Sequence, residues 1–440
     1  MEHPMFSHFF CVESSFSVIF YGRIGEKAYI CSGFYTLLSM KRTSKTLQRC
    51  FCALFLWLTV LSAACARKNG GTPLMGWRMV LDPAQTAQQA ALNKAGYRHV
   101  SLDDTFSEGS RLITYDSDDL WSSVKRILAG NLCLSAYCTG GHFNDMNTLE
   151  VGRSMSSVED ETHFGMWCLM SSPLIIGDDL TSLADKPATL LLLTNPDLIA
   201  LNQDPLHLQA EVYQKEGECF ILAKDIQKFQ GRKRAIGIYN PSDTDCTVNL
   251  NLEALELGGS IQLYDCFTRS AEASFSSSET HPVTVPAHGC RIFLAKGQTR
   301  LERKYYGAAC AWSAGFQGLL PSEDDAVTTY EPHASSRCGY VASHLGKRAE
   351  DDLQWRNIFV NKDGKRWLTI SYFSSEPLEM LLEVNGQLVT KLKATSRNIL
   401  RRSRVMVEVA LLKGNNTIRL FNPSGAMPNI EGLEVGEAEE

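Results

Sequence analysis

The hydrophobic pattern of this chain changes near Leu206, and that change limits its possible folds more than any other feature. Before Leu206, short apolar runs alternate with segments that have the period of amphipathic helices. After it, short stretches alternate apolar and polar residues, and turn residues such as Asn240-Pro241-Ser242-Asp243 separate them. The pattern predicts an α/β part followed by all-β parts in one chain of 440 residues.

The α/β part begins with a strand, a helix and a second strand, at Pro73–Val80, Ala84–Ala95 and Val100–Leu102. Strands joined in this way default to parallel pairing. The elements expected further along are the helix Leu120–Ala129, the strand Asn131–Tyr137, a helix from the capping-box pattern at Ser156–Glu159 through Met170, the strand Pro173–Gly177 and the short helix Leu190–Leu193.

Aspartates gather just after the apolar runs of this part. Asp103 and Asp104 follow the strand that ends at Leu102, and Asp116 precedes the helix that begins at Leu120. Carboxylates at strand exits are how α/β enzymes build a polar site above a packed core. The alternative is structural: Asp103 and Asp104 cap the next turn, and Asp116 complements the dipole of the following helix.

Six stretches, in order, together resemble the α-galactosidase (melibiase) family, glycoside hydrolase family 27. They are Thr72-Pro73-Leu74-Met75-Gly76-Trp77, Leu102-Asp103-Asp104, the Asp116 segment with Asp119 and Trp121, Gly141-His142-Phe143-Asn144-Asp145, Pro173-Leu174-Ile175-Ile176-Gly177-Asp178-Asp179-Leu180 and Leu201-Asn202-Gln203-Asp204-Pro205. The resemblance covers residues 70–297 and implies a (β/α)8 barrel followed by an antiparallel β domain. It also implies cleavage of terminal α-linked galactose with retention, without a cofactor.

The resemblance assigns roles to particular residues. It implies that Asp116 is the general acid/base, which protonates the leaving oxygen and later deprotonates water. The substrate-binding residues that it implies are Trp77, Asp103, Asp104, Arg111, His142 and Asp145. Taken alone, a histidine such as His142 is more often structural than catalytic.

The chain departs from the family between Phe106 and Arg111, where only four residues stand. In the family, this interval holds three further strands, one of which carries the nucleophilic aspartate. The remaining strands resemble family strands one, two, six, seven and eight, so we expect five parallel strands in an incomplete, partly open barrel. We expect impaired hydrolysis as well, and the alternative function is a non-catalytic, galactoside-binding remnant.

The all-β parts divide near residue 297. The first resembles the C-terminal domain of the family. The second has a strong hairpin signal at Asn385-Gly386 and resembles a β-sandwich carbohydrate-binding module. The predicted fold is therefore multidomain α/β plus all-β: a partial (β/α)8 barrel at 70–204, an antiparallel β domain at 205–297 and a C-terminal β-sandwich at 298–440.

The N-terminal region resembles an export signal. A basic stretch follows Met40, and an apolar run from Phe51 to Ala64 ends in small residues before Cys65. We expect residues 40–65 to be a signal peptide, and residues 1–39 to be a gene-model extension preceding a start at Met40. The protein would be secreted, periplasmic or attached to the cell envelope through a lipidated Cys65.

The net charge and the cysteine spacing limit the classes of ligand that the chain is expected to bind. A formal net charge of −6 argues against nucleic acid, and galactose-containing glycans are the partners that the resemblance implies. Nine of the fourteen cysteines lie beyond the processed region, without paired Cys-x-x-Cys clusters, so we predict no metal site. Cys133 and Cys138 are close enough in sequence for a disulfide to remain open.

Overall fold

The computed structural model describes the chain in two units, residues 1–70 and 71–440. It describes residues 7–12, 15–24 and 27–36 as backbone, and then 72–78, 87–101, 119–138, 142–177, 183, 185–227, 232–272, 274–318 and 327–437. In the first unit, β1 (Ser7–Val12), β2 (Ser15–Ile24) and β3 (Lys27–Thr36) form an antiparallel sheet, a pattern that the sequence analysis did not detect. The predicted signal peptide, 40–65, lies outside the described residues.

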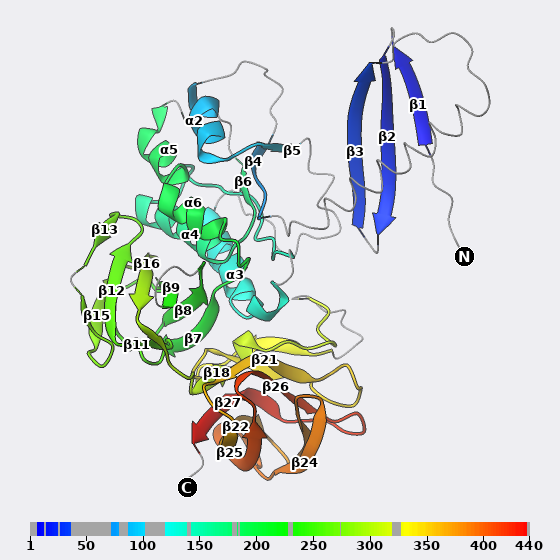
Figure 1. Ribbon diagram of the computed structural model, residues 1–440, viewed down its shortest axis with the longest axis vertical. Coiled ribbons are helices and arrows are strands. Elements are labelled where there is room, and N and C mark those ends of the chain that lie inside the picture. Colours follow the sequence, from blue (N-terminus) through cyan, green and yellow to red (C-terminus); the bar gives the residue numbers. More distant parts are fainter. Residues whose placement is uncertain are drawn as a thin grey trace. The chain divides into compact units, whose positions relative to one another are not determined.

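The second unit begins with a small parallel sheet (Figure 1). Its order is β5 (His99–Ser101), β4 (Met75–Arg78) and β6 (Leu174–Ile176), and Leu149 makes a further parallel bridge to Ile176. The predictions of a strand near each of these positions are confirmed. Parallel pairing places the carboxyl ends of the strands along one edge.

Helices accompany this sheet. They are α2 (Ala87–Ala95), α3 (Leu120–Asn131), α4 (Ser157–Leu169), α5 (Pro187–Leu193) and α6 (Pro196–Asn202). The predicted capping box is confirmed, since Ser156 and Glu159 bond to each other's backbone amides. Asp119 caps α3 by accepting from the Ser122 amide at 3.0 Å. Helix α4 packs against α6 on one side and against the antiparallel sheet on the other.

The predicted strand Asn131–Tyr137 is wrong. Helix α3 continues through Asn131, and Ser135–Tyr137 forms the 3-10 helix η2. Leu132, Cys133 and Leu134 are buried, so the apolar run is real, but an apolar run by itself does not distinguish a strand from a buried helix end. The described residues therefore contain three paired parallel strands and one bridge where five strands were expected.

An antiparallel sheet follows, with strand order β13-β12-β16-β9-β8-β7 and β14 beside β12. The strands are β7 (Glu211–Glu216), β8 (Cys219–Asp225), β9 (Arg232–Tyr239), β12 (Ser260–Asp265), β13 (Ser270–Ala271), β14 (Phe275–Ser276) and β16 (Cys290–Gly297). Two smaller pairs complete this part: β10 (Cys246–Leu250) with β15 (His281–Val285), and β11 (Leu257–Gly258) with β17 (Thr299–Arg300). The turn residues Asn240-Pro241-Ser242-Asp243, expected to separate strands, lie between β9 and β10.

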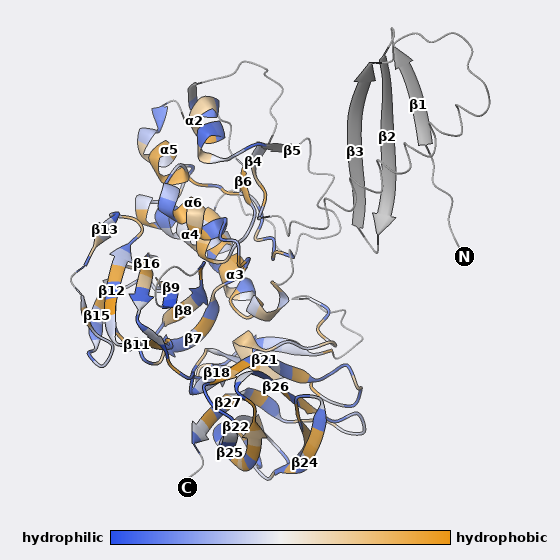
Figure 2. Cartoon of the chain, in the orientation of Figure 1, coloured by the Kyte–Doolittle hydropathy of each residue, from blue (hydrophilic) through white to orange (hydrophobic). Residues whose placement is uncertain are grey.

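Two further sheets form the C-terminal part. One has the order β19-β20-β27-β22-β25 with β18 beside β27, and the other β21-β26-β23-β24. The strands are β18 (Tyr305–Gly307), β19 (Thr329–Pro332), β20 (Tyr340–Ser343), β21 (Leu353–Val360), β22 (Gly364–Ser374), β23 (Leu378–Val384), β24 (Gln387–Ala394), β25 (Asn398–Leu411), β26 (Gly414–Phe421) and β27 (Asn429–Glu437). Figure 2 shows hydrophobic and hydrophilic residues alternating along them. The predicted hairpin at Asn385-Gly386 joins β23 to β24, and both residues have positive φ.

Candidate functional site

The residues predicted to form the site divide into two groups. Asp103, Asp104, Arg111 and Asp116 lie outside the described residues. Trp77, His142 and Asp145 are described, and all three belong to the parallel sheet or to the loop that precedes its bridge at Leu149.

Trp77 lies in the middle of the parallel sheet. On β4 it pairs with Val100 of β5 on one side and with Ile176 of β6 on the other. It is 9% exposed and belongs to the main hydrophobic core. Its position near the carboxyl ends of three strands fits a residue that borders a site, and its burial equally fits a core residue.

The loop at 142–150 carries His142 and Asp145, which are both exposed. Asn144 anchors the loop: its Nδ2 donates to the Leu134 carbonyl at 2.9 Å and to Gln209 Oε1 at 2.7 Å. Asp145 Oδ1 accepts from the Asn147 amide at 2.9 Å, an Asx-type turn that fixes the carboxylate. The loop therefore presents one imidazole and one oriented carboxylate to the outside of the described part.

Helix α4 supports this loop from beneath. Trp167 Nε1 donates to the Asn147 carbonyl at 3.0 Å, and the His163 ring lies 4.1 Å from the Trp167 ring. Burial lowers the pKa of His163 to about 3, so this imidazole is neutral across the physiological range. His163 thus contributes packing and polarity to the loop's support.

Glu150, which was not among the predicted site residues, is 5% exposed and follows the Leu149 bridge. Its Oε1 accepts from Thr148 Oγ1 at 2.7 Å, and its Oε2 forms an ion pair with Arg153. A side chain on Gly177, directly after β6, would come within 2.3 Å of Glu150 Oε1. A buried carboxylate at the carboxyl edge of a parallel sheet is a site-type position, and its place directly after the apolar Leu149 was the signal available in the sequence.

Metal and disulfide chemistry find little support in the part of the chain that the structure describes. No group of three or more His, Cys, Asp or Glu side chains there has metal-binding geometry. Cys133 and Cys138 are both buried and free, so the disulfide left open between them is not formed. Burial raises the pKa of the Cys133 thiol to about 12, which keeps it protonated and unreactive.

One further structural observation bears on membranes. Among the described residues, no helix combines the length and the apolar character that a membrane crossing requires.

One family model matches part of the chain. The model of a family described as "Alpha galactosidase A" matches residues 107–204. The matched range includes Arg111, Asp116, His142 and Asp145, and it begins after Asp103 and Asp104.

Individual relatives are named as α-galactosidases. Alpha-galactosidase A of Cellvibrio japonicus is 43% identical over 110 residues, which are 24% of this chain and 27% of that protein. Alpha-galactosidase 3 of Arabidopsis thaliana is 29% identical over 194 residues, which are 42% of this chain and 43% of that protein. The solved structure of α-galactosidase I from Mortierella vinacea has a TM-score of 0.37 and 24% identity over 40% of this chain and 46% of its own. The matched part of the chain spans less than half the length of each of these relatives.

Proposed function

Through residues 107–204 the chain belongs to the α-galactosidase family, and on that premise we propose that it is an α-galactosidase-type glycoside hydrolase with impaired activity. Its substrates would be oligosaccharides or polysaccharides that end in α-linked galactose. The observation that carries this proposal is the family match over the segment that contains Asp116, His142 and Asp145.

The proposed fold of the catalytic part is a partial (β/α)8 barrel. Strands β5, β4 and β6, followed by the Leu149 bridge, have the neighbour relations of consecutive strands in such a barrel. Barrel enzymes carry their sites at the carboxyl ends of the strands, and the loop at 142–150 leads into the bridge at that edge.

The residues take the following proposed roles. Asp116 acts as general acid on the leaving oxygen and then as general base on water. Asp103 and Asp104 accept hydrogen bonds from galactose hydroxyls, because charged acceptors bind hydroxyls strongly. Trp77, Arg111, His142 and Asp145 complete the sugar site.

Impairment follows from the short interval between Phe106 and Arg111. A retaining mechanism needs two carboxyls about 5 Å apart, one of which forms the covalent intermediate. With Asp116 alone, acid catalysis supplies roughly 10²–10⁴-fold, far below the total acceleration of a typical enzyme. The second candidate, a non-catalytic galactoside-binding protein, is favoured by this same interval.

Hydrolysis is measured with an aryl α-galactoside and the purified chain. We expect slow or undetectable release of the aryl group, and any slow release should disappear in Asp116→Ala. Robust turnover that Asp116→Ala abolishes would contradict the impairment and would mean that another carboxylate serves as nucleophile. Robust turnover that survives Asp116→Ala would remove Asp116 from the mechanism.

Galactose binding separates the hydrolase proposal from an unrelated function. We expect the chain to bind galactose in a calorimetric titration, with the affinity reduced about tenfold or more in Asp104→Asn. The matched control is Glu376→Gln, which removes one exposed charge in the C-terminal part. Absence of both galactose binding and hydrolysis would overturn the proposal.

Export and glycan attachment belong to the same proposal. Residues 40–65 would direct the chain to the cell exterior or envelope, with or without lipid on Cys65, and 298–440 would act as a carbohydrate-binding module. The N-terminal mass of the native protein tests the first point: a mass that includes residues before Met40 would contradict it.

A further inference from the structure

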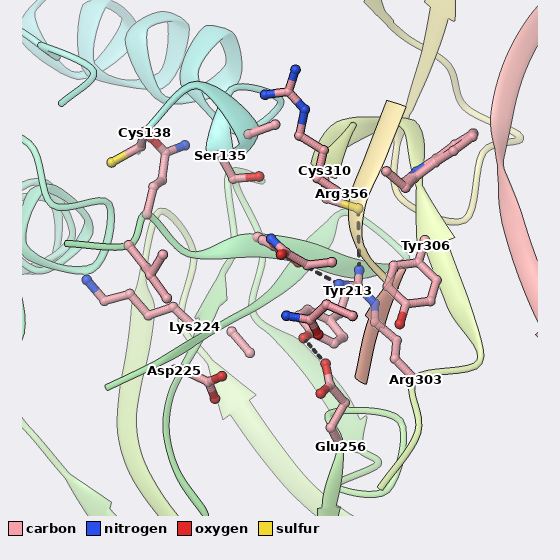
Figure 3. A pocket seen from close by; sticks show the side chains of 18 of the residues that line it. Ser135, Cys138, Tyr213, Lys224, Asp225, Glu256, Arg303, Tyr306, Cys310 and Arg356 are labelled. Atoms are coloured by element: carbon pink, nitrogen blue, oxygen red, sulfur yellow. Dashed lines mark hydrogen bonds and ion pairs between the residues drawn. The ribbon is translucent and has the colours of Figure 1, made fainter. Parts of the chain in front are cut away.

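A cavity of about 400 Å³ lies where the helical part, the antiparallel sheet and the C-terminal part meet (Figure 3). Ser135 and Cys138 border it from the first part, Tyr213 and Glu256 from the second, and Arg356 from the third. Its volume falls within the range of about 300–1,000 Å³ that small-molecule sites occupy. Its lining includes none of the residues proposed above for the galactose site.

The charge of this cavity is strongly unbalanced. Six basic side chains line it against three carboxylates, those of Glu211, Asp225 and Glu256. The basic residues are Lys224, Arg232, Arg234, Arg300, Arg303 and Arg356. Because buried positive charge is costly without a partner, the excess favours an anionic occupant.

The carboxylates are already engaged by the deeper arginines. Glu256 pairs with Arg232 at 3.0 Å and with Arg234 at 3.1 Å, and Asp225 pairs with Arg232 at 2.8 Å. Arg303, which is 4% exposed, pairs with Glu211 at 2.5 Å. All three carboxylates of the lining are therefore paired, and part of the positive charge of the lining is left without a carboxylate partner.

Lys224 contributes a cation with only neutral hydrogen-bond partners. It is 3% exposed, and its Nζ donates to Ser171 Oγ at 2.7 Å and to the Leu201 carbonyl at 3.3 Å. Burial lowers the pKa of Lys224 to about 8, against the opposing effects of Cys138 and Asp204. An anion in the cavity would stabilise the charged form of this amine.

Arg356 is the exposed cation of the cavity. Its guanidinium lies 3.6 Å from the centre of the Trp312 ring, and its Nε donates to Gln354 Oε1 at 3.3 Å. This leaves much of the planar fork of donors for a ligand, and such a fork matches a carboxylate in two parallel hydrogen bonds. The amides of Asn357 and Asn415, both exposed, line the same cavity and can donate to or accept from hydroxyls.

We propose that this cavity binds a carboxylate-bearing sugar, a uronic acid unit of an acidic oligosaccharide. Its carboxylate would pair with Arg356, and its hydroxyls would bond to the amides of Asn357 and Asn415. A simple anion would satisfy the charge, but it would leave most of the volume and both amides unused. This goes beyond the proposed hydrolase function, because it adds a second site with a different ligand.

The test is a calorimetric titration of the full chain with digalacturonate, with the neutral galactose disaccharide and with inorganic phosphate. We expect digalacturonate to bind, and its affinity to fall as salt rises, because an exposed ion pair is screened. Arg356→Gln should weaken digalacturonate binding about tenfold or more, since it removes a charge-assisted contact, and should leave binding of the neutral disaccharide unchanged. Asn357→Ala should weaken digalacturonate binding by a smaller factor.

The control is Arg401→Gln, which removes an equal charge from an exposed position that does not line this cavity. Both Arg356 and Arg401 are exposed, so neither variant should prevent folding, and far-ultraviolet circular dichroism checks this directly. No binding of digalacturonate, equal losses in Arg356→Gln and Arg401→Gln, or phosphate binding as tight as digalacturonate binding would each overturn the proposal.

Discussion

At the scale of single residues, Glu256 is the centre of a buried charge network. It is 5% exposed, accepts from Tyr213 Oη at 2.6 Å, and pairs with Arg232, Arg234 and Arg300. Burial raises the pKa of a carboxyl, but here Arg234 and Arg232 outweigh it and hold the pKa of Glu256 at about 2. The ionised carboxylate is therefore part of the folded state.

We expect Glu256→Gln to lower the free energy of unfolding by about 3–5 kcal/mol, because it leaves buried guanidinium groups without their anion. Thermal unfolding at pH 7 measures this, with the exposed Glu279→Gln as control. The folded pKa lies below the unfolded one, so the contribution is full above about pH 4.3 and is lost as pH falls through about 2. A difference between variant and parent that stays constant down to pH 2 would contradict the assignment.

At the scale of elements, helix α4 packs against both helix α6 and the antiparallel sheet. Two glycines permit the close approach of α4 to the antiparallel sheet. A Cβ on Gly165 of α4 would come within 2.7 Å of Phe267, and a Cβ on Gly237 of β9 would come within 2.2 Å of Leu169. Leu169 is fully buried, so it has no room to move aside. The position of α4 therefore depends on the two glycines as much as on the apolar face of the helix.

We expect Gly237→Ala to destabilise the fold by about 1–3 kcal/mol, the typical cost of overpacking a closed core. Gly436→Ala is the matched control, because a Cβ there meets only the Trp367 carbonyl, at 3.9 Å. Urea unfolding midpoints compare the two variants. Equal midpoints would mean that α4 and β9 can separate at little cost.

The N-terminus of α4 offers a smaller, local test. Ser156 accepts from the Glu159 amide, and Glu159 reaches back to the Ser156 amide at 2.8 Å. We expect Ser156→Ala to cost about 1 kcal/mol, because one helix-end donor loses its acceptor. The neighbouring exposed Ser157→Ala serves as control in the same urea titration, and a larger loss there would contradict the capping role.

At the scale of the whole molecule, tyrosine hydroxyls join the helical part to the C-terminal part. Tyr340 Oη donates to the Ala129 carbonyl at 2.6 Å, and Tyr330 Oη donates to the Ala311 carbonyl at 2.7 Å. Tyr137 Oη contacts Tyr330 Oη at 3.0 Å and accepts from the Ser313 amide at 2.9 Å. Residues 71–440 accordingly form one unit of contacts.

We expect a chain that ends at residue 300 to aggregate or to unfold at a clearly lower temperature, because it uncovers this buried surface. Size-exclusion chromatography and thermal unfolding measure both outcomes. Deletion of residues 1–69, which belong to a separate unit, is the control and should leave the unfolding temperature of the remainder unchanged. A soluble monomer ending at residue 300 with the parent's unfolding temperature would show that the parts are independent.

Local signals in the sequence were sufficient for caps, turns and most strands. Asp119, the Ser156–Glu159 box and Asn385-Gly386 act through their own backbone neighbours, so their effects need no distant contact. Strand β21 (Leu353–Val360) also follows from a local pattern, since its buried and exposed residues largely alternate. Strand β24 follows the predicted Asn385-Gly386 hairpin, and its apolar Leu388 and Val389 are exposed.

Tertiary structure decided what depends on residues distant in sequence. The apolar run Asn131–Tyr137 is equally compatible with a strand. In the folded chain it holds the end of α3, a turn and η2, and Gln209 donates to the Asn131 carbonyl while Ser135 donates to the Ala309 carbonyl. Burial of Glu150 and the charged cavity around Glu256 likewise arise only when separate elements meet. The sequence by itself carried the family resemblance, the succession of α/β and β parts and the local caps, because these are encoded in short stretches. Burial, charge balance and the shape of a cavity are sums over distant neighbours, and only the folded chain brings those neighbours together.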